Sequence, residues 1–162
     1  KNRFSLKVRD DLNVQDFLEL SEKTFNSKGI NQPFSKDLVQ RIDDTCGERN
    51  VKKILIAEDS KGQRHAGIYI VWDENSVYYL MGGGDPLLRR SGATSLCMWE
   101  AILFAASLKK SFDFEGSMLE PVERFFRGFG AFQTPYFSVS RTPSRFIKVY
   151  FFVKDMILNN HL

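Results

Sequence analysis

The stretch that decides the fold of this chain reads Asp85-Pro86-Leu87-Leu88-Arg89-Arg90-Ser91-Gly92-Ala93-Thr94. It follows a predicted strand, Val77 to Met81, and precedes an apolar helix that begins near Thr94. A loop that leads from a strand into a helix can bind an anion, because free N–H groups and the positive end of the helix dipole point outward together. Gly92 lets the backbone approach a phosphate, and the guanidinium groups of Arg89 and Arg90 match phosphate oxygens. The alternative is an ordinary helix start with arginines on the surface.

The length and composition indicate one folded domain over residues 1–162. The chain is 43% hydrophobic and 14% aromatic, which excludes a disordered segment. A net charge of +3 permits an anionic ligand but does not indicate binding of bulk nucleic acid.

Cysteine usage and apolar patterning predict a cytoplasmic protein. Cys46 and Cys97 do not form a disulfide framework, so a reducing compartment is expected. The apolar stretch from Leu96 to Leu108 is too short to span a membrane, and no signal peptide is visible. His65 and His161 lie far from both cysteines, so no metal site is predicted.

Hydrophobic periodicity and turn residues predict strands and helices in a defined order. The predicted strands are 4–8, 53–57, 66–72, 77–81, 112–115 and 132–139, and the predicted helices are 14–25, 35–46, 94–109 and 119–127. A helix is favoured over a strand for the tail, 144–159. Three sequential strands indicate an antiparallel meander, and the following strand–helix–strand unit adds a parallel neighbour. The fold class is therefore mixed α/β, with a mostly antiparallel sheet flanked by helices on both faces.

The spacing Pro86-x-x-Arg89-x-x-Gly92-x-Thr94 resembles the pyrophosphate loop of the GNAT acyltransferases. This resemblance implies a GNAT fold and an acyl-CoA donor, acetyl-CoA or another. It implies that the donor is held by Arg89, Arg90, Ser91, Gly92, Ala93 and Thr94. Thr94 stands where the family has a small residue.

Further motifs are similar to the FemAB-like group, which includes peptidoglycan aminoacyltransferases. They are Tyr78-Tyr79-Leu80, Met98-Trp99-Glu100-Ala101-Ile102, Phe112-Asp113-Phe114-Glu115-Gly116-Ser117 and Arg124-Phe125-Phe126-Arg127-Gly128-Phe129-Gly130. Phe126 falls where GNAT enzymes often have the tyrosine that protonates the departing thiolate. Members of the group commonly carry two GNAT-like lobes. This chain is long enough for one lobe, so the alternatives are a single GNAT-like domain and the C-terminal lobe of a longer protein, completed by a second lobe or a homodimer. The chain opens on Lys1 without Met, as expected of a piece of a longer protein or of a chain with a cleaved leader.

Four polar residues near the predicted cleft are candidates for chemistry. Asp113 and Glu115 lie two apart on a predicted strand, so their carboxylates project to one face, and either could act as general base toward an amine. Arg124 and Arg127 lie three apart on a helix and could bind an anionic substrate or a tRNA backbone. The alternatives are structural hydrogen bonding for the carboxylates and a solvated face for the arginines. Ser117 and Glu120 are predicted to form a capping box for the helix that follows.

The sequence predicts transfer of an acyl group, or of an aminoacyl group from tRNA, to an amine-bearing substrate such as a cell-wall precursor. The alternatives are a non-catalytic lobe that binds substrate or partner within a two-lobe transferase, and a domain that binds aminoacyl-tRNA. Steep loss of tRNA binding with salt would distinguish the last of these.

Overall fold

A computed structural model describes residues 5–117, 119–135, 137, 139, 141 and 144–159. The chain divides into two compact units, residues 1–131 and 132–162, and each is described by itself. Within the described residues, no helix is long and apolar enough to cross a membrane.

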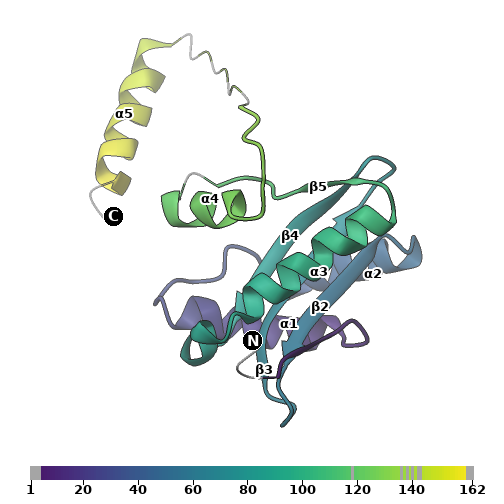
Figure 1. Cartoon of the computed structure of the whole chain (residues 1–162). Helices are drawn as coiled ribbons and strands as arrows, with labels where there is room; N and C mark the ends of the chain where they lie inside the picture. Colours follow the sequence, from purple (N-terminus) through teal and green to yellow (C-terminus); the bar gives the residue numbers. More distant parts are fainter. Residues whose placement is uncertain are drawn as a thin grey trace. The chain divides into compact units, whose positions relative to one another are not determined.

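The first unit is built on a five-stranded sheet in the order β1-β2-β3-β4-β5 (Figure 1). Its strands are β1 (Lys7–Arg9), β2 (Lys52–Glu58), β3 (Arg64–Trp72), β4 (Ser76–Gly84) and β5 (Ser111–Asp113). Neighbouring strands are antiparallel except β4 and β5, which are parallel. This confirms the predicted mixed, mostly antiparallel sheet. A parallel neighbour needs a crossover, which the helix between β4 and β5 supplies.

Helices cover both faces of this sheet, as the sequence predicts (Figure 1). On one face lie α1 (Val14–Asn26) and α2 (Lys36–Glu48), and α1 begins with a capping box between Asn13 and Asp16. A core that includes Phe17 and Ile56 forms between these helices and the sheet.

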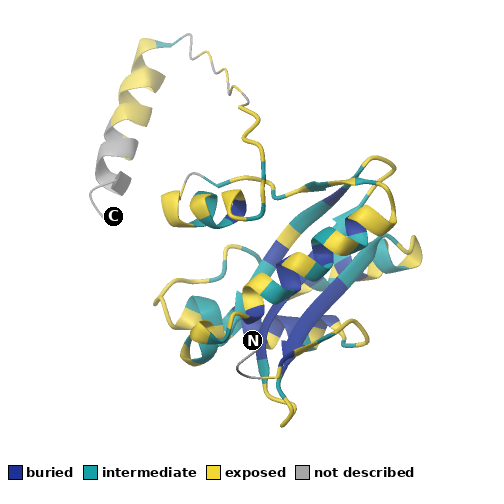
Figure 2. Ribbon diagram, in the orientation of Figure 1, coloured by how far each residue is buried: buried dark blue, intermediate teal, exposed yellow. Residues whose placement is uncertain are grey.

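The other face carries α3 (Ala93–Ser107), which packs its buried residues on β2 and β3 (Figure 2). The hydrophobic core between α3 and the sheet also includes Phe126 of α4 (Glu120–Arg127). The outer side of α3 exposes Trp99 and Leu103.

Two local predictions are wrong. The described residues of the predicted strand 132–139, which are 132–135, 137 and 139, are neither strand nor helix. Pro135 in this stretch has no N–H to give to a strand ladder. The predicted capping box also fails, because Leu119 is the N-cap of α4 and Glu120 is its first residue. The Ser117 hydroxyl instead accepts a hydrogen bond from the Leu119 N–H at 3.1 Å.

The second unit contains α5 (Arg145–Asn159), which confirms the helix favoured for the tail. The sequence predicts an apolar face on this helix that docks a second lobe or a second copy, formed by Phe146, Val149, Val153 and Ile157. Phe146 and Val149 are exposed, whereas the side chains of residues 153 and 157 lie outside what the structure describes. The docking partner stays a prediction.

Candidate functional site

The candidate site lies along β4 beyond the point where its pairing with β5 ends. Hydrogen-bonded register between β4 and β5 covers three pairs, of which Tyr78 and Asp113 are the last. Since β5 ends at Asp113, β4 continues from Tyr79 without a strand beside it in the described part of the chain. We call residues 79–83 the open edge of β4.

A β-bulge at Leu80 changes which way the side chains of β4 point. Tyr69 pairs with Met81 and Ile70 pairs with Tyr79, so Leu80 has no residue opposite it. After the bulge Met81 faces the core beneath α1, whereas Tyr79 packs on the core beneath α3. The Tyr79 hydroxyl lies over Gly82, because a Cβ built on Gly82 would be 2.0 Å from that oxygen.

The ladder with β3 determines which backbone groups face the open edge. Asp85 donates its N–H to the carbonyl of His65 at 2.8 Å, whereas Gly84 turns its N–H away from β3 to the Thr24 hydroxyl, also at 2.8 Å. Since these directions alternate along an antiparallel pair, the N–H and C=O of Gly82 point outward with those of Gly84. The Gly82 N–H has no acceptor among the described residues and is free to donate to a ligand.

Helix α1 packs against the end of β4 and fixes its position. A Cβ on Gly83 would lie 2.6 Å from the backbone nitrogen of Ser21, so only glycine permits this approach. The Thr24 hydroxyl accepts from the Gly84 N–H and contacts the Gly84 carbonyl as donor at 2.9 Å. The single proton of this hydroxyl also has the Leu20 carbonyl within reach at 3.2 Å, and its shorter contact is with Gly84, so α1 provides partners for both polar groups of Gly84.

The stretch predicted to be a loop forms a 3-10 helix, η1 (Pro86–Ser91), that leads into α3. The Asp85 carboxylate caps η1 by accepting from the Leu87 N–H at 3.0 Å. It also pairs with Lys23 of α1 at 3.0 Å, and the hydrogen bond from Lys23 is the main cause that lowers the pKa of Asp85. Gly92 then turns the chain into α3 with a φ of +80°, a left-handed conformation that favours glycine.

The junction of η1 and α3 brings two arginine side chains to the positive end of a helix dipole. Arg89 and Arg90 are exposed and make no ion pair within the described residues. Gly92, the N-cap of α3, has no side chain to cap the helix, so the N–H groups of Thr94 and Ser95 in the first turn have no acceptor among the described residues. A Cβ on Gly92 would meet nothing within 4 Å, which leaves room for a ligand. Two arginines and the N–H groups at a helix N-terminus are the kinds of donor that bind a pyrophosphate.

The other predicted donor-binding residues lie at the same junction. Ala93 is buried and donates its N–H to the Ser91 hydroxyl at 3.3 Å. Thr94 is exposed in the first turn of α3, so its branched side chain stands in solvent rather than in the packed core. Binding of a phosphate by these residues stays a prediction.

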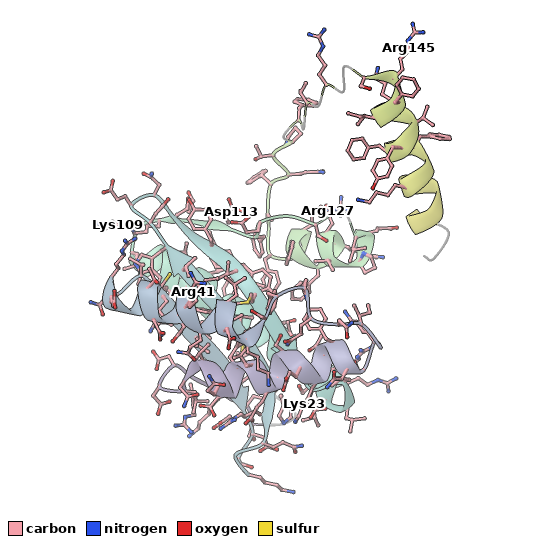
Figure 3. All side chains as sticks on the ribbon, turned by 180° about the vertical axis from the view of Figure 1, so that it is seen from behind. Lys23, Arg41, Lys109, Asp113, Arg127 and Arg145 are labelled. Atoms are coloured by element: carbon pink, nitrogen blue, oxygen red, sulfur yellow. The ribbon has the colours of Figure 1, made fainter. Side chains whose placement is uncertain are left out.

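The two candidate carboxylates do not share a strand face, contrary to expectation. Asp113 is exposed at the end of β5 (Figure 3), and Glu115 lies beyond the strand with a φ of +59°. The Asp113 carboxylate accepts from the Glu115 N–H at 2.8 Å and so stabilises this turn. The sequence pattern missed the early end of β5, because a left-handed residue followed by Gly116 turns the chain. A role for either carboxylate as general base stays a prediction.

The two candidate substrate-binding arginines lie on α4 in different environments. Arg127 pairs with Glu123 at 2.8 Å, whereas Arg124 is exposed without an ion pair to a described residue (Figure 3 labels Arg127). Between them Phe126 is buried, and its ring lies 5.9 Å from the ring of Tyr79. Only Arg124 is therefore available to an external anion without breaking an ion pair.

Sequence reasoning missed three parts of this site: the outward N–H of Gly82, the hydroxyl of Tyr79 above it, and the Thr24 contact that fixes Gly84. One signal was present, the triplet Gly82-Gly83-Gly84 at a strand end, because glycines within a strand often mark a bulge or a close approach. Among the described residues, no cluster of three or more His, Cys, Asp or Glu could hold a metal ion.

Comparisons with known proteins agree with the fold described above. A sequence model described as the acetyltransferase (GNAT) domain matches residues 2–125. No curated protein sequence matches the chain.

Solved structures of several acetyltransferases have a similar fold. An acetyltransferase of Trypanosoma brucei has a TM-score of 0.59 at 15% identity, over 85% of this chain and 99% of the other. Glucosamine-6-phosphate N-acetyltransferase of Arabidopsis thaliana gives 0.59 at 11% identity, over 86% and 99%. The protein AAC(6')-Iy, in complex with the bisubstrate analogue CoA-S-monomethyl-acetylneamine, gives 0.62 at 10% identity, over 86% and 99%. Identities this low establish likeness of fold alone.

Proposed function

The chain belongs to the GNAT acetyltransferase family, and on that premise we propose that it transfers an acyl group, acetyl in the simplest case, from acyl-CoA to a primary amine. The observation that carries this proposal is one stretch of the chain, the path that leads from the open edge of β4 through η1 to the first turn of α3. Along it lie an outward N–H at Gly82 and two arginines without ion pairs, Arg89 and Arg90.

Each part of the path has a chemical role in the proposed reaction. The N-terminus of α3 and the guanidinium groups of Arg89 and Arg90 bind the donor's pyrophosphate. The outward N–H of Gly82 donates to the thioester carbonyl oxygen and stabilises the negative charge that develops there. The donor supplies an activated carbonyl, so the protein mainly has to orient that carbonyl and the amine toward each other.

The amine must reach the carbonyl unprotonated. Asp113 and Glu115 are our candidates to accept its proton, directly or through a water molecule, since both are exposed, Asp113 as the last paired residue of β5 and Glu115 just beyond it. Arg124 is a candidate to bind an anionic group on the acceptor. The acceptor class beyond a primary amine is left open by these residues.

Calorimetric titration with acetyl-CoA tests the donor site. We expect saturable binding by the wild type, and a loss of about tenfold in affinity for Arg89→Ala and for Arg90→Ala, because each removes a charge-assisted contact. Arg41→Ala is the matched control, since Arg41 is also an exposed arginine without an ion pair to a described residue but lies on α2 (Figure 3). Its affinity should equal that of the wild type.

Absence of acetyl-CoA binding by the wild type would contradict the proposal. The next titration would then use aminoacyl-tRNA, and salt-sensitive binding there would support the aminoacyl-transfer alternative. Binding of acetyl-CoA without thiol release in the presence of primary amines would favour a non-catalytic lobe. That alternative draws on one observation, the buried Phe126, which has no proton to donate.

A further inference from the structure

One polar group at the open edge of β4 has no role in the site as described so far, the hydroxyl of Tyr79. A Cβ on Gly82 would lie 2.0 Å from the hydroxyl oxygen and 3.1 Å from Cζ, so the phenol occupies the space directly above the Gly82 α-carbon. Any larger residue at position 82 would displace it. Gly82 therefore brings the hydroxyl next to an outward backbone N–H.

Aromatic contacts hold the Tyr79 ring in this place. Phe126 of α4 packs edge-on against it with ring centroids 5.9 Å apart, and Phe114 packs in turn against Phe126 at 5.0 Å. The surroundings are apolar, and burial raises the pKa of the Tyr79 hydroxyl, so the phenol keeps its proton at neutral pH.

Tyr79 differs from the other tyrosines of β3 and β4 in the state of its hydroxyl. The Tyr69 hydroxyl donates to Asp43 at 3.0 Å on the opposite face of the sheet, and the Tyr78 hydroxyl donates to Asp73 at 2.9 Å. The Tyr79 hydroxyl has no partner among the described residues. Tyr79 is half-buried, so water can hydrate its hydroxyl in the free protein, and a ligand can take the place of that water.

The proposed reaction needs a proton at one defined atom. The amine nitrogen forms a bond to the carbonyl carbon, and the carbon–sulfur bond breaks with its electron pair on sulfur. The nitrogen releases one proton to solvent or to a carboxylate, and sulfur must gain one to leave as a thiol. The carbonyl oxygen and the sulfur are bonded to the same carbon, so a donor for sulfur must lie close to the N–H that holds the oxygen.

We propose that Tyr79 is this proton donor: its phenolic O–H hydrogen-bonds to the thioester sulfur and transfers its proton as the carbon–sulfur bond breaks, while the Gly82 N–H holds the carbonyl oxygen. The phenolate then regains a proton from water, which restores the phenol and balances the step. This inference rests on the proposed function and adds the group that makes the thiol a good leaving group.

A binding experiment tests the contact without any turnover. Calorimetric titration compares CoA with desulfo-CoA, which lacks the sulfur atom. The wild type should prefer CoA by about fivefold, the value of one neutral hydrogen bond, and Tyr79→Phe should bind the two equally. Tyr78→Phe is the matched control and should keep the preference. Equal binding of the two ligands by the wild type would overturn the proposal.

A kinetic experiment tests the proton transfer. Thiol release from acetyl-CoA is followed with kanamycin, glucosamine 6-phosphate and a lysine peptide as acceptor probes. Tyr79→Phe should lower kcat by about 100-fold with little change in the KM for acetyl-CoA, as expected for loss of a general acid. Tyr78→Phe should leave both parameters unchanged. A thermal unfolding midpoint equal to that of the wild type would show that Tyr79→Phe is folded.

The outcomes separate this inference from the function on which it rests. Turnover by the wild type with an unimpaired Tyr79→Phe variant would refute the role of Tyr79 and leave the transferase proposal intact. Absence of acetyl-CoA binding by the wild type would refute the proposed function itself.

Discussion

Two stretches at the end of β4 differ in how completely their polar groups are used: the stretch that α1 covers, residues 83–85, which we call the α1 side, and the uncovered stretch before it together with the turn into α3, which we call the open side. On the side of α1, Thr24 satisfies both backbone groups of Gly84, Lys23 pairs with Asp85, and Ser21 fills the space beside Gly83. On the open side, the Gly82 N–H, the Tyr79 hydroxyl and the two arginines of η1 have no partner among the described residues.

This difference indicates that the two stretches have different roles, one in stability and the other in binding. Polar groups next to a packed helix must be hydrogen-bonded, because leaving one buried and unsatisfied costs about 1–3 kcal/mol. Groups at an open edge are hydrated, so they can stay unpaired at small cost and remain available to a ligand. The α1 side therefore provides rigidity, and the open side provides the binding groups.

The largest expected effect comes from testing the close approach of α1. Gly83→Ala should destabilise the fold by about 3 kcal/mol, because its Cβ would overlap the backbone of Ser21. Gly92→Ala on the open side is the matched control. It has free space around it, so its cost of about 1 kcal/mol arises only from the positive φ. Urea unfolding measures both, and equal losses would show that the two sides do not differ in packing.

A smaller effect is expected from removing the hydroxyl that satisfies Gly84. Thr24→Val keeps the shape of the side chain but leaves the N–H and C=O of Gly84 without their partner, and should cost about 2 kcal/mol. Thr45→Val on α2 removes a hydroxyl that bonds only to the carbonyl of Arg41, and should change stability by less than about 0.5 kcal/mol. A loss for Thr24→Val as small as that for Thr45→Val would mean that water replaces the hydroxyl.

The smallest effect is expected at the ion pair between Lys23 and Asp85. Lys23 is 53% exposed, so Lys23→Gln should lower the free energy of unfolding by about 0.5 kcal/mol at about pH 7. Lys23 lowers the pKa of Asp85 in the folded state, so the pair's contribution is present above the unfolded carboxyl pKa of about 3.9 and is lost as the pH falls through the folded value.

The stability difference between wild type and Lys23→Gln should accordingly be smaller at an acidic pH below the unfolded carboxyl pKa than at about pH 7, because protonation of Asp85 removes the charge that pairs with Lys23. Denaturant unfolding of both proteins at the two pH values measures this difference in the free energy of unfolding. A difference that persists unchanged at the acidic pH would assign the effect of Lys23 to packing of its methylene chain rather than to its charge.

Much of the fold follows from local signals in the sequence. The predicted helices 14–25 and 35–46 form as α1 and α2, and the three central strands form as β2, β3 and β4. These elements carry strong periodicity and begin or end at capping residues such as Asn13 and Ser35. Prediction fails where periodicity is weak, as at 132–139 and at Glu115, where a turn overrides a short alternating pattern.

The candidate site could be predicted only in part. The spacing of Pro86, Arg89 and Gly92 predicts the turn into α3, where we propose that the donor's pyrophosphate binds, because a 3-10 turn followed by a helix N-terminus depends on neighbouring residues. The extension of β4 through Gly84 could not be predicted, since three glycines alone indicate a loop. Those glycines are strand residues because β3 pairs with them and because α1, some sixty positions earlier, packs on Gly83 and Gly84.

The sequence by itself therefore determined the order and kind of most elements of the first unit, the family and the cationic turn, because each depends on residues close together in the chain. The tertiary structure alone decided the bulge at Leu80, the outward direction of the Gly82 N–H and the place of the Tyr79 hydroxyl. The physical reason is that strand register and helix packing are set by contacts between distant segments, and a one-residue shift in register turns every side chain of a strand to the opposite face.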